Sequence, residues 1–223
     1  MKIVAINGSP KGKISNTNTM VNSFLTGAQE AGAEVFNIFL AEKEINYCKG
    51  CYSCWFKSPG KCIIKDDMTD VISHLAGANV IVLASPLYFN NISGTLKVFM
   101  DRLTVTGSPH PPKEVKVENK DDTPHDAVPP KLVMISNCGF PDRSQFQVVS
   151  LWIKRVAVMM QTNLIGEIYA VQGKFLSNPT DELRPAIDRY LKLLESAGKE
   201  IALNLKLSKT TENLLQYDFT QNG

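Results

Sequence analysis

The chain has 223 residues, and its 24 Lys and Arg nearly balance its 22 Asp and Glu. With 43% hydrophobic residues it is typical of a soluble globular protein, and it lacks the basic stripe with which nucleic-acid-binding proteins neutralise phosphates. No apolar run approaches the roughly 20 residues that span a bilayer. The N-terminal apolar run is too short for a signal peptide, so we expect a cytoplasmic protein.

Short β-branched runs alternate with helical periodicities along the chain. Strands are predicted at 2–6, 34–39, 79–84, 131–136 and 163–171. Helices are predicted at 16–31, at 66–78 behind the capping pair Asp66-Asp67, and at 94–103, 142–161 and 181–205. Five strands that are each followed by a helix indicate an α/β fold: a doubly wound parallel five-stranded sheet in a three-layer α/β/α arrangement.

The predicted elements form a single domain over residues 1–206. Two segments interrupt it: a cysteine-rich loop over 47–65, and a Pro-rich insertion over 104–130 whose composition cannot supply a core. Residues 207–223 are weakly patterned and are predicted to form a C-terminal tail. Ligands of doubly wound sheets bind outside the carboxyl ends of the strands, which directs attention to three loops there.

The first of these loops, residues 7–17, combines small polar side chains with the start of a helix. Unpaired N–H groups at a helix N-terminus favour an anion, so the loop is a candidate phosphate site. It has neither G-x-G-x-x-G nor Walker A spacing, and a phosphate here would be held without a metal. The alternative is a turn followed by an ordinary helix cap. The candidate binding residues are Ser9, Lys11, Ser15, Asn16 and Thr17.

Two short motifs carry a family resemblance. Gly8-Ser9-Pro10 followed by Ser15-Asn16-Thr17 resembles the FMN-phosphate loop of the NADPH-dependent FMN reductase branch of the flavodoxin-like superfamily. Residues 85–89 and 93–97, with Asp101-Arg102 closing the helix, resemble the second flavin loop of that family. The resemblance covers most of residues 1–165. It implies a flavodoxin-like sheet ordered 2-1-3-4-5, FMN across its carboxyl edge, and a homodimer or homotetramer.

The second and third loops fit a flat flavin ring. The turn Pro86-Leu87-Tyr88-Phe89-Asn90 offers a rigid apolar and aromatic surface, and its N–H groups could bond the ring edge where charge accumulates on reduction. In the third loop, Gly139 permits close approach of the backbone, and Cys138 is expected to be a small buried residue and not a nucleophile. The alternative is that the aromatic side chains merely cover the end of the sheet.

Four of the five cysteines, Cys48, Cys51, Cys54 and Cys62, lie in one stretch. Three thiolates at successive x2 spacing can hold one [4Fe–4S] cluster, and a Pro-Gly turn could return Cys62 to the same cluster. The motif resembles that of iron–sulfur flavoproteins, and also that of relatives that have no visible cluster. Free thiols are therefore the alternative. Zinc fits the spacing less well, and disulfides are not expected in a reducing cytoplasm.

The resemblance implies an FMN-dependent oxidoreductase that moves reducing equivalents from NAD(P)H to a quinone, a flavin or another acceptor. No side chain is expected to act as an obligatory acid or base, because the flavin carries the chemistry. One alternative is an iron–sulfur electron carrier that exchanges electrons with a ferredoxin-like protein partner. Another is a non-enzymatic module organised by structural zinc. The sequence does not distinguish NADH from NADPH.

Overall fold

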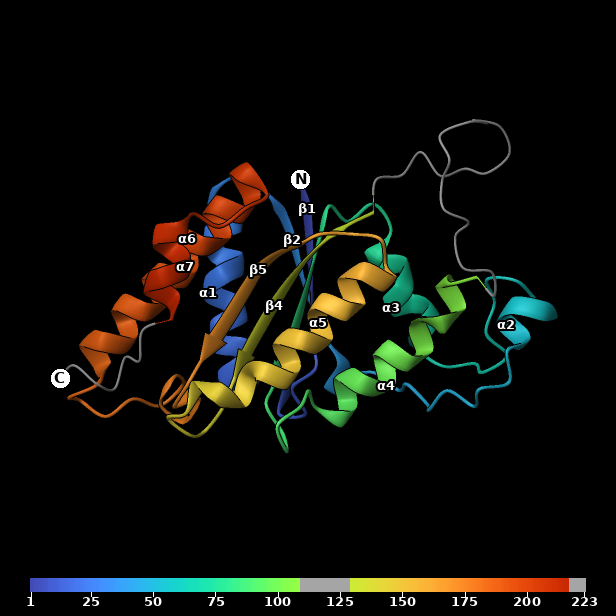
Figure 1. The fold of residues 1–223 in the computed structure, drawn as a ribbon, viewed down its shortest axis with the longest axis horizontal. Coiled ribbons are helices and arrows are strands. Elements are labelled where there is room, and N and C mark those ends of the chain that lie inside the picture. Colours follow the sequence, from blue (N-terminus) through green and yellow to red (C-terminus); the bar gives the residue numbers. More distant parts are fainter. Residues whose placement is uncertain (109–128, 217–223) are drawn as a thin grey trace.

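The computed structural model describes residues 1–108 and 129–216 (Figure 1). Five parallel strands form one sheet in the order β2-β1-β3-β4-β5, which confirms the predicted flavodoxin-like fold class. The strands are β1 (Lys2–Asn7), β2 (Glu34–Phe39), β3 (Val80–Pro86), β4 (Lys131–Asn137) and β5 (Leu164–Ala170). Each lies within two residues of its predicted bounds.

Helices cover both faces of the sheet (Figure 1). One face packs against α1 (Asn16–Glu30), α6 (Arg184–Asn204) and α7 (Lys209–Leu215). The other packs against α3 (Met68–Leu75), α4 (Gly94–Arg102) and α5 (Gln147–Met159). No helix of the described ranges is long and apolar enough to cross a membrane.

Alternation along the central strands explains their unbroken apolar sequences. In β1, Ile3 and Ala5 enter the core beneath α1 and α6, whereas Val4 and Ile6 enter the core beneath α3 and α4. All four side chains are fully buried. A strand covered on both faces has no polar side, as expected for a parallel sheet between two helical layers.

The strand register aligns the carboxyl ends of β1, β3 and β4. Asn7 lies beside Ala84, and Pro86 lies beside Asn137. The loops that leave these three strands therefore emerge together at one edge of the sheet, where the sequence predicted a ligand site.

The structure differs from the predicted elements mainly at short helices. The predicted helix 142–161 begins as a 3₁₀ turn, Arg143–Phe146, before α5, and the predicted helix 181–205 begins only at Arg184. The cysteine-rich loop contains one helical turn, α2 (Ser53–Phe56), and the segment predicted as a tail contains α7. Leu207 and Leu215 of that segment are buried in the core. Residues 109–128 of the Pro-rich insertion lie outside the described residues.

Candidate functional site at the carboxyl edge

Backbone and hydroxyl hydrogen bonds join the three loops at the carboxyl edge of the sheet. The Gly8 N–H donates to the Ala84 carbonyl over 2.7 Å, and the Ser93 hydroxyl donates to the Gly8 carbonyl over 2.6 Å. The Leu87 N–H donates to the Asn137 carbonyl over 2.8 Å. The first loop is thus bonded to the second, and the second to the third, so the edge is held as one unit.

Gly8 is required by this packing. A Cβ atom at this position would lie 2.5 Å from the Leu96 Cβ and 3.2 Å from the Ala84 carbonyl oxygen. Neither atom is the far end of a flexible side chain, so any larger residue would push α4 away from the sheet. The glycine therefore sets how closely the first loop approaches the helix that follows the second loop.

The first loop positions several polar groups at the start of α1. Ser15 is the N-cap: its hydroxyl donates to the Gly12 carbonyl and accepts from the Asn18 N–H. The buried Thr17 hydroxyl accepts from the Asn137 side-chain amide over 2.8 Å, which leaves its own proton free to donate. Within the described residues, the hydroxyl of buried Ser9 forms no hydrogen bond. Ser9 and Thr17 thus keep donor capacity that the cap residue Ser15 has spent.

The two other predicted phosphate residues lie farther out. Asn16 uses its side-chain oxygen to accept from the N–H and the hydroxyl of Ser177, which ties the loop to the segment after β5. Lys11 is exposed and forms no ion pair with any described residue. The N–H groups of Asn16 and Thr17 belong to the first helical turn, where N–H groups have no intrahelical acceptor.

The second loop projects an aromatic side chain from a tight turn. Tyr88 and Asn91 pair across the turn, and Phe89 and Asn90 between them have φ values of +50° and +60°. Two positive φ values are the pattern of a type I′ turn, which normally selects Asn or Gly. Phe89 is nevertheless fully exposed there, and the N–H groups of Phe89 and Asn90 donate to no described residue. A strained, exposed aromatic residue at a loop tip is typical of a functional position.

The third loop is anchored by backbone bonds to the segment after β5. Cys138 is buried as expected, with its N–H on the Ala170 carbonyl, its carbonyl accepting from the Gly173 N–H, and its thiol donating to the Phe140 carbonyl. Burial raises the pKa of this thiol, so it stays protonated. A Cβ at Gly139 would meet no protein atom within 4 Å, so the space beside this backbone is open.

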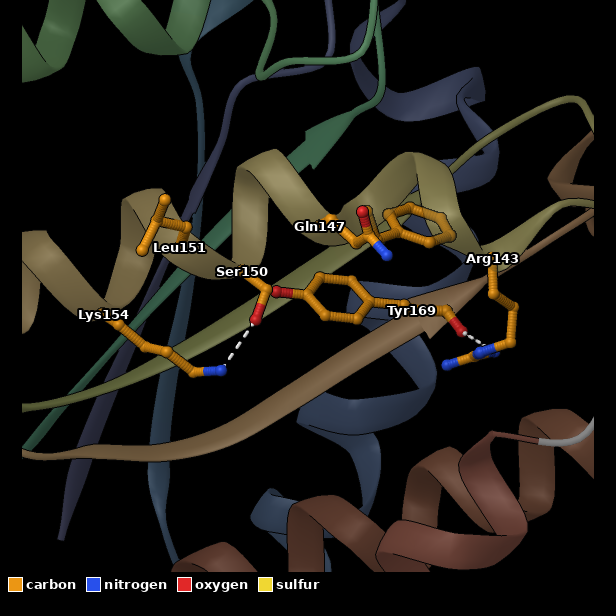
Figure 2. Close-up of a pocket in the computed structure, with 7 residues that line it drawn as sticks. Arg143, Gln147, Ser150, Leu151, Lys154 and Tyr169 are labelled. Carbon is orange, nitrogen blue, oxygen red and sulfur yellow. Dashed lines mark hydrogen bonds between the residues drawn. The ribbon is translucent and has the colours of Figure 1, made fainter.

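A separate cavity of about 360 Å³ lies between α5 and β5 (Figure 2). It contains none of the predicted site residues, and its lining is Arg143, Phe146, Gln147, Ser150, Leu151, Lys154 and Tyr169. The Tyr169 ring stacks on Phe146, and its hydroxyl donates to Glu167, which also pairs with Lys154. These polar groups already bond one another. The cavity therefore lies among side chains that pack α5 on the edge strand β5, and it is not part of the loop site.

The cysteine-rich loop, residues 47–65, extends away from the sheet beside the end of α4 (Figure 1). It carries four lysines and no acidic residue, and within the described residues none of its side chains belongs to either hydrophobic core. One of its anchors is Trp55, whose indole N–H donates to the Thr104 carbonyl over 2.7 Å. The loop is therefore a basic, aromatic appendage held at few points.

Three thiols of this loop, Cys48, Cys51 and Cys62, lie within electrostatic range of the fourth, Cys54. Burial raises the pKa of Cys54, and negative charge on Cys62, Cys48 or Cys51 raises it further. Hydrogen bonds from Ser53 lower the pKa of Cys51. The described residues nevertheless contain no group of three or more His, Cys, Asp or Glu side chains already arranged to hold a metal ion. The thiols fit a thiolate-bound group by type and number, and the loop would have to close around it.

A buried ion pair lies at the base of the loop, and nothing in the sequence pattern predicts it. Arg102, the last residue of α4, forms two hydrogen bonds of 2.6 and 3.0 Å with the Asp66 carboxylate. Both side chains are 1% exposed. Burial alone would raise the pKa of Asp66, but the bonds from Arg102, Asn46 and Met68 hold it at about 2. The sequence suggested only a helix cap for Asp66, because partners 36 residues apart leave no local pattern.

Comparison with known proteins places these observations in a family. Over 102 residues the chain is 42% identical to an iron–sulfur flavoprotein of Methanocaldococcus jannaschii, a match that covers 46% of this chain and 51% of that protein. An iron–sulfur flavoprotein of Archaeoglobus fulgidus is 36% identical over 107 residues, or 48% of this chain and 47% of that protein. The chain thus matches only about half the length of these curated relatives.

Solved structures share the fold at low sequence identity. An FMN-dependent NADH-azoreductase from Bacillus anthracis, in complex with FMN, has a TM-score of 0.61 at 18% identity and covers 91% of this chain and all of its own. An NAD(P)H:quinone oxidoreductase from Methanothermobacter marburgensis has a TM-score of 0.62 at 13% identity, with 90% and 96% covered. The family model for NADPH-dependent FMN reductase matches residues 1–170, most of the chain. The chain therefore belongs to the NADPH-dependent FMN reductase family.

Proposed function

We propose that the protein is an FMN-dependent oxidoreductase that takes reducing equivalents from NAD(P)H and delivers them to a quinone, a flavin or another acceptor. The observation that carries this proposal is the bonded set of three loops at the carboxyl edge, with unused donors in the first loop and an exposed aromatic turn in the second. Family membership supports FMN as the cofactor. When bound, FMN would accept a hydride and pass electrons on.

The first loop would bind the phosphate of FMN. Ser9 and Thr17 each offer a hydroxyl proton that no described residue accepts. The first N–H groups of α1, at the positive end of the helix dipole, would also face the anion. Lys11 would add a mobile positive charge from the rim. Ser15 would act indirectly, because its hydroxyl holds the helix start in place.

The second and third loops would bind the flavin ring. The N–H groups of Phe89 and Asn90 are available to its polar edge, and Pro86, Leu87 and Tyr88 provide the adjoining surface. The open space beside Gly139 would admit the ring on the other side. Cys138, buried and protonated, would contribute shape and not nucleophilic chemistry.

Substitutions at the start of α1 test this assignment. Thr17→Ala and Asn16→Ala should each weaken FMN binding, measured by fluorescence titration of the FMN-depleted protein, whereas Thr17→Ser keeps the hydroxyl and should retain most of the affinity. Steady-state oxidation of NADH and of NADPH with a quinone acceptor then identifies the donor. FMN affinity that is unchanged by Thr17→Ala, or a protein that oxidises neither nucleotide, would contradict the proposal.

A second candidate is an electron carrier that contains a [4Fe–4S] cluster and exchanges electrons with a ferredoxin-like partner. The four neighbouring thiols favour it, as do the names of the curated relatives. The visible spectrum of anaerobically purified protein, with iron, sulfide and zinc assays, separates the candidates. Flavin bands without iron support the reductase, and added iron–sulfur absorption supports the carrier. A colourless zinc protein would support the structural module that we disfavour.

The assembly is also proposed, as a homodimer or homotetramer in the cytoplasm. Helix α5 leaves four apolar side chains half exposed or more, Val148, Leu151, Val158 and Met159, and an exposed apolar patch is typical of a protein interface. Light scattering coupled to size-exclusion chromatography measures the mass directly. A monomer at micromolar concentration would contradict the proposal.

A further inference from the structure

Arg102 is buried at the base of the cysteine-rich loop and contacts the loop at both ends. Its guanidinium donates to the Asn46 carbonyl over 2.8 Å, just before the loop, and to the Asp66 carboxylate, just after it. A third contact enters the loop itself: Nη2 donates to the Cys62 Sγ over 3.6 Å. Only one of its side-chain nitrogens, Nε, has no partner among the described residues.

The same ion pair closes the neck of the loop. Asp66 accepts from the Asn46 N–H over 2.9 Å and from the Met68 N–H over 3.1 Å, so its carboxylate bonds the chain segments on both sides of the neck. One step further out, the Glu44 N–H donates to Asp67 and the Asp67 N–H donates to the Glu44 carbonyl. Residues 47–65 therefore leave and rejoin the domain at one point, and Arg102 lies at that point.

A simple structural pair does not account for the sulfur contact. Arginine is always charged and presents its N–H groups in a rigid fork, so the two bonds to Asp66 fix the plane from which Nη2 reaches Cys62. Of the four thiols in the loop, Cys62 is the one whose sulfur accepts a hydrogen bond from a positively charged side chain among the described residues. Among the described residues, the loop forms one other side-chain hydrogen bond to α4 or the turn that follows it, from Trp55 to the Thr104 carbonyl.

We propose that Arg102 is a positioning residue for the thiolate site: it holds Cys62 at the neck and donates a hydrogen bond to its sulfur when the four thiols bind a cluster or a metal ion. This inference rests on the proposed thiolate site of the cysteine-rich loop. Groups that orient a ligand from behind contribute to metal affinity, and hydrogen bonds to cluster sulfurs raise the reduction potential because they stabilise the added negative charge.

Cobalt binding to the full FMN-loaded chain, reduced and free of oxygen, tests this role without requiring activity. Co²⁺ alone is titrated, and its thiolate-to-cobalt absorption reports the site. Arg102→Gln should weaken Co²⁺ binding by roughly 10- to 100-fold. Arg102→Lys keeps the charge but not the fork, and should recover part of the affinity. Lys97→Gln, which removes an exposed cation from the same helix, should bind Co²⁺ like the wild type.

A second readout is the reduction potential after anaerobic reconstitution with ferrous iron and sulfide. The potential of the Arg102→Gln cluster should shift to a lower value, and that of Lys97→Gln should not move. A purely structural ion pair would change the stability of the chain but leave the potential of any cluster that still forms. Wild-type Co²⁺ affinity and an unshifted potential in Arg102→Gln would overturn the proposal.

Arg102→Gln leaves the buried Asp66 unpaired and could unfold the protein, so a double variant decides that case. Arg102→Met with Asp66→Asn removes both buried charges, and its FMN content and melting temperature report the fold. The folded double variant should bind Co²⁺ as weakly as Arg102→Gln, and wild-type affinity there would overturn the proposal. If the wild-type chain itself binds neither Co²⁺ nor a cluster, the thiolate site fails and this role with it. If the wild type and all variants bind alike, only the role of Arg102 fails.

Discussion

The two ends of helix α4 lie in regions that are built in different ways. At its first turn, buried Ser93 caps the helix and bonds Gly8, within a set of backbone hydrogen bonds that joins three loops. At its last residue, Arg102 holds the cysteine-rich loop through side-chain contacts at a narrow neck. The nine residues of the helix separate the regions by about 13 Å of rise.

This difference indicates how each region acquires its final geometry. The carboxyl edge is preorganised, since the loops are fixed to strands that are buried on both faces. Within the described residues, the cysteine-rich loop contributes no side chain to either hydrophobic core, and its thiols are not already arranged to hold a metal ion. Binding of a metal ion or cluster would therefore complete the structure of the loop. We therefore expect substitutions at the edge to change stability, and substitutions among the thiols to change only what the loop binds.

Gly8→Ala should have the largest effect on the carboxyl edge. The new methyl group would overlap Leu96, so the free energy of unfolding should fall by up to about 3 kcal/mol, as measured by urea denaturation. FMN affinity should fall with it, because the first loop and α4 move apart. Gly139→Ala is the matched control, since its methyl group meets no protein atom and should not lower the free energy of unfolding. Equal stability of the two variants would contradict the preorganised edge.

Acid should act on the neck of the cysteine-rich loop. The pKa of Asp66 is about 2 in the folded chain against 3.8 for a free carboxyl, so its contribution is complete above the free value and is lost as the pH falls through the folded one. For this nearly unexposed group the contribution is about 2 kcal/mol. Urea denaturation between pH about 5 and pH about 2 should show a correspondingly shallower loss in the Arg102→Met, Asp66→Asn double variant. Parallel pH profiles would mean that the pair contributes nothing net.

The sequence predicted the sheet and its edge because both follow from local patterns. Short runs typical of strands marked all five strands, and α1 ends within one residue of its predicted bound, just before Gly32 with its φ of +87°. The short helices α2 and α7 have too few turns to produce a periodicity. Helix α7 is stabilised by tertiary contacts, including the bonds of Ser208 and Thr211 to Glu200.

The candidate site was predictable as a set of residues but not as a division of roles. In the sequence, Ser9, Ser15 and Thr17 are equivalent candidates, whereas the structure commits the Ser15 hydroxyl to the helix cap and leaves the other two with free protons. Which hydroxyl is spent depends on a neighbour 120 residues away for Thr17. The pairing of Arg102 with Asp66 escapes prediction for the same reason: each residue belongs to a local motif, but nothing in the sequence links two residues that lie 36 positions apart.

One buried hydroxyl at the edge should matter more for stability than one thiol in the loop. Thr17→Val removes the acceptor of the buried Asn137 amide and should lower the free energy of unfolding by about 1 to 2 kcal/mol. Cys51→Ser, at an exposed position, should stay within about 0.5 kcal/mol of the wild type when the chain carries no metal, yet should abolish any cluster. Thermal unfolding of both variants with FMN removed gives the comparison. A Cys51→Ser variant that loses FMN and unfolds would show that the thiols are part of the fold.

Phe89→Asn should have the smallest effect on stability and the opposite sign. Asn tolerates the left-handed conformation of this turn better than Phe, and the fully exposed ring makes no packing contribution, so the free energy of unfolding should rise by at most about 1 kcal/mol. If the ring faces the flavin or its acceptor, kcat/KM for the quinone should fall even as the melting temperature holds or increases. The preorganised edge would then keep an unfavourable residue because binding uses it. A fall in stability with unchanged kcat/KM would instead identify Phe89 as a packing residue and remove the loop tip from the proposed site.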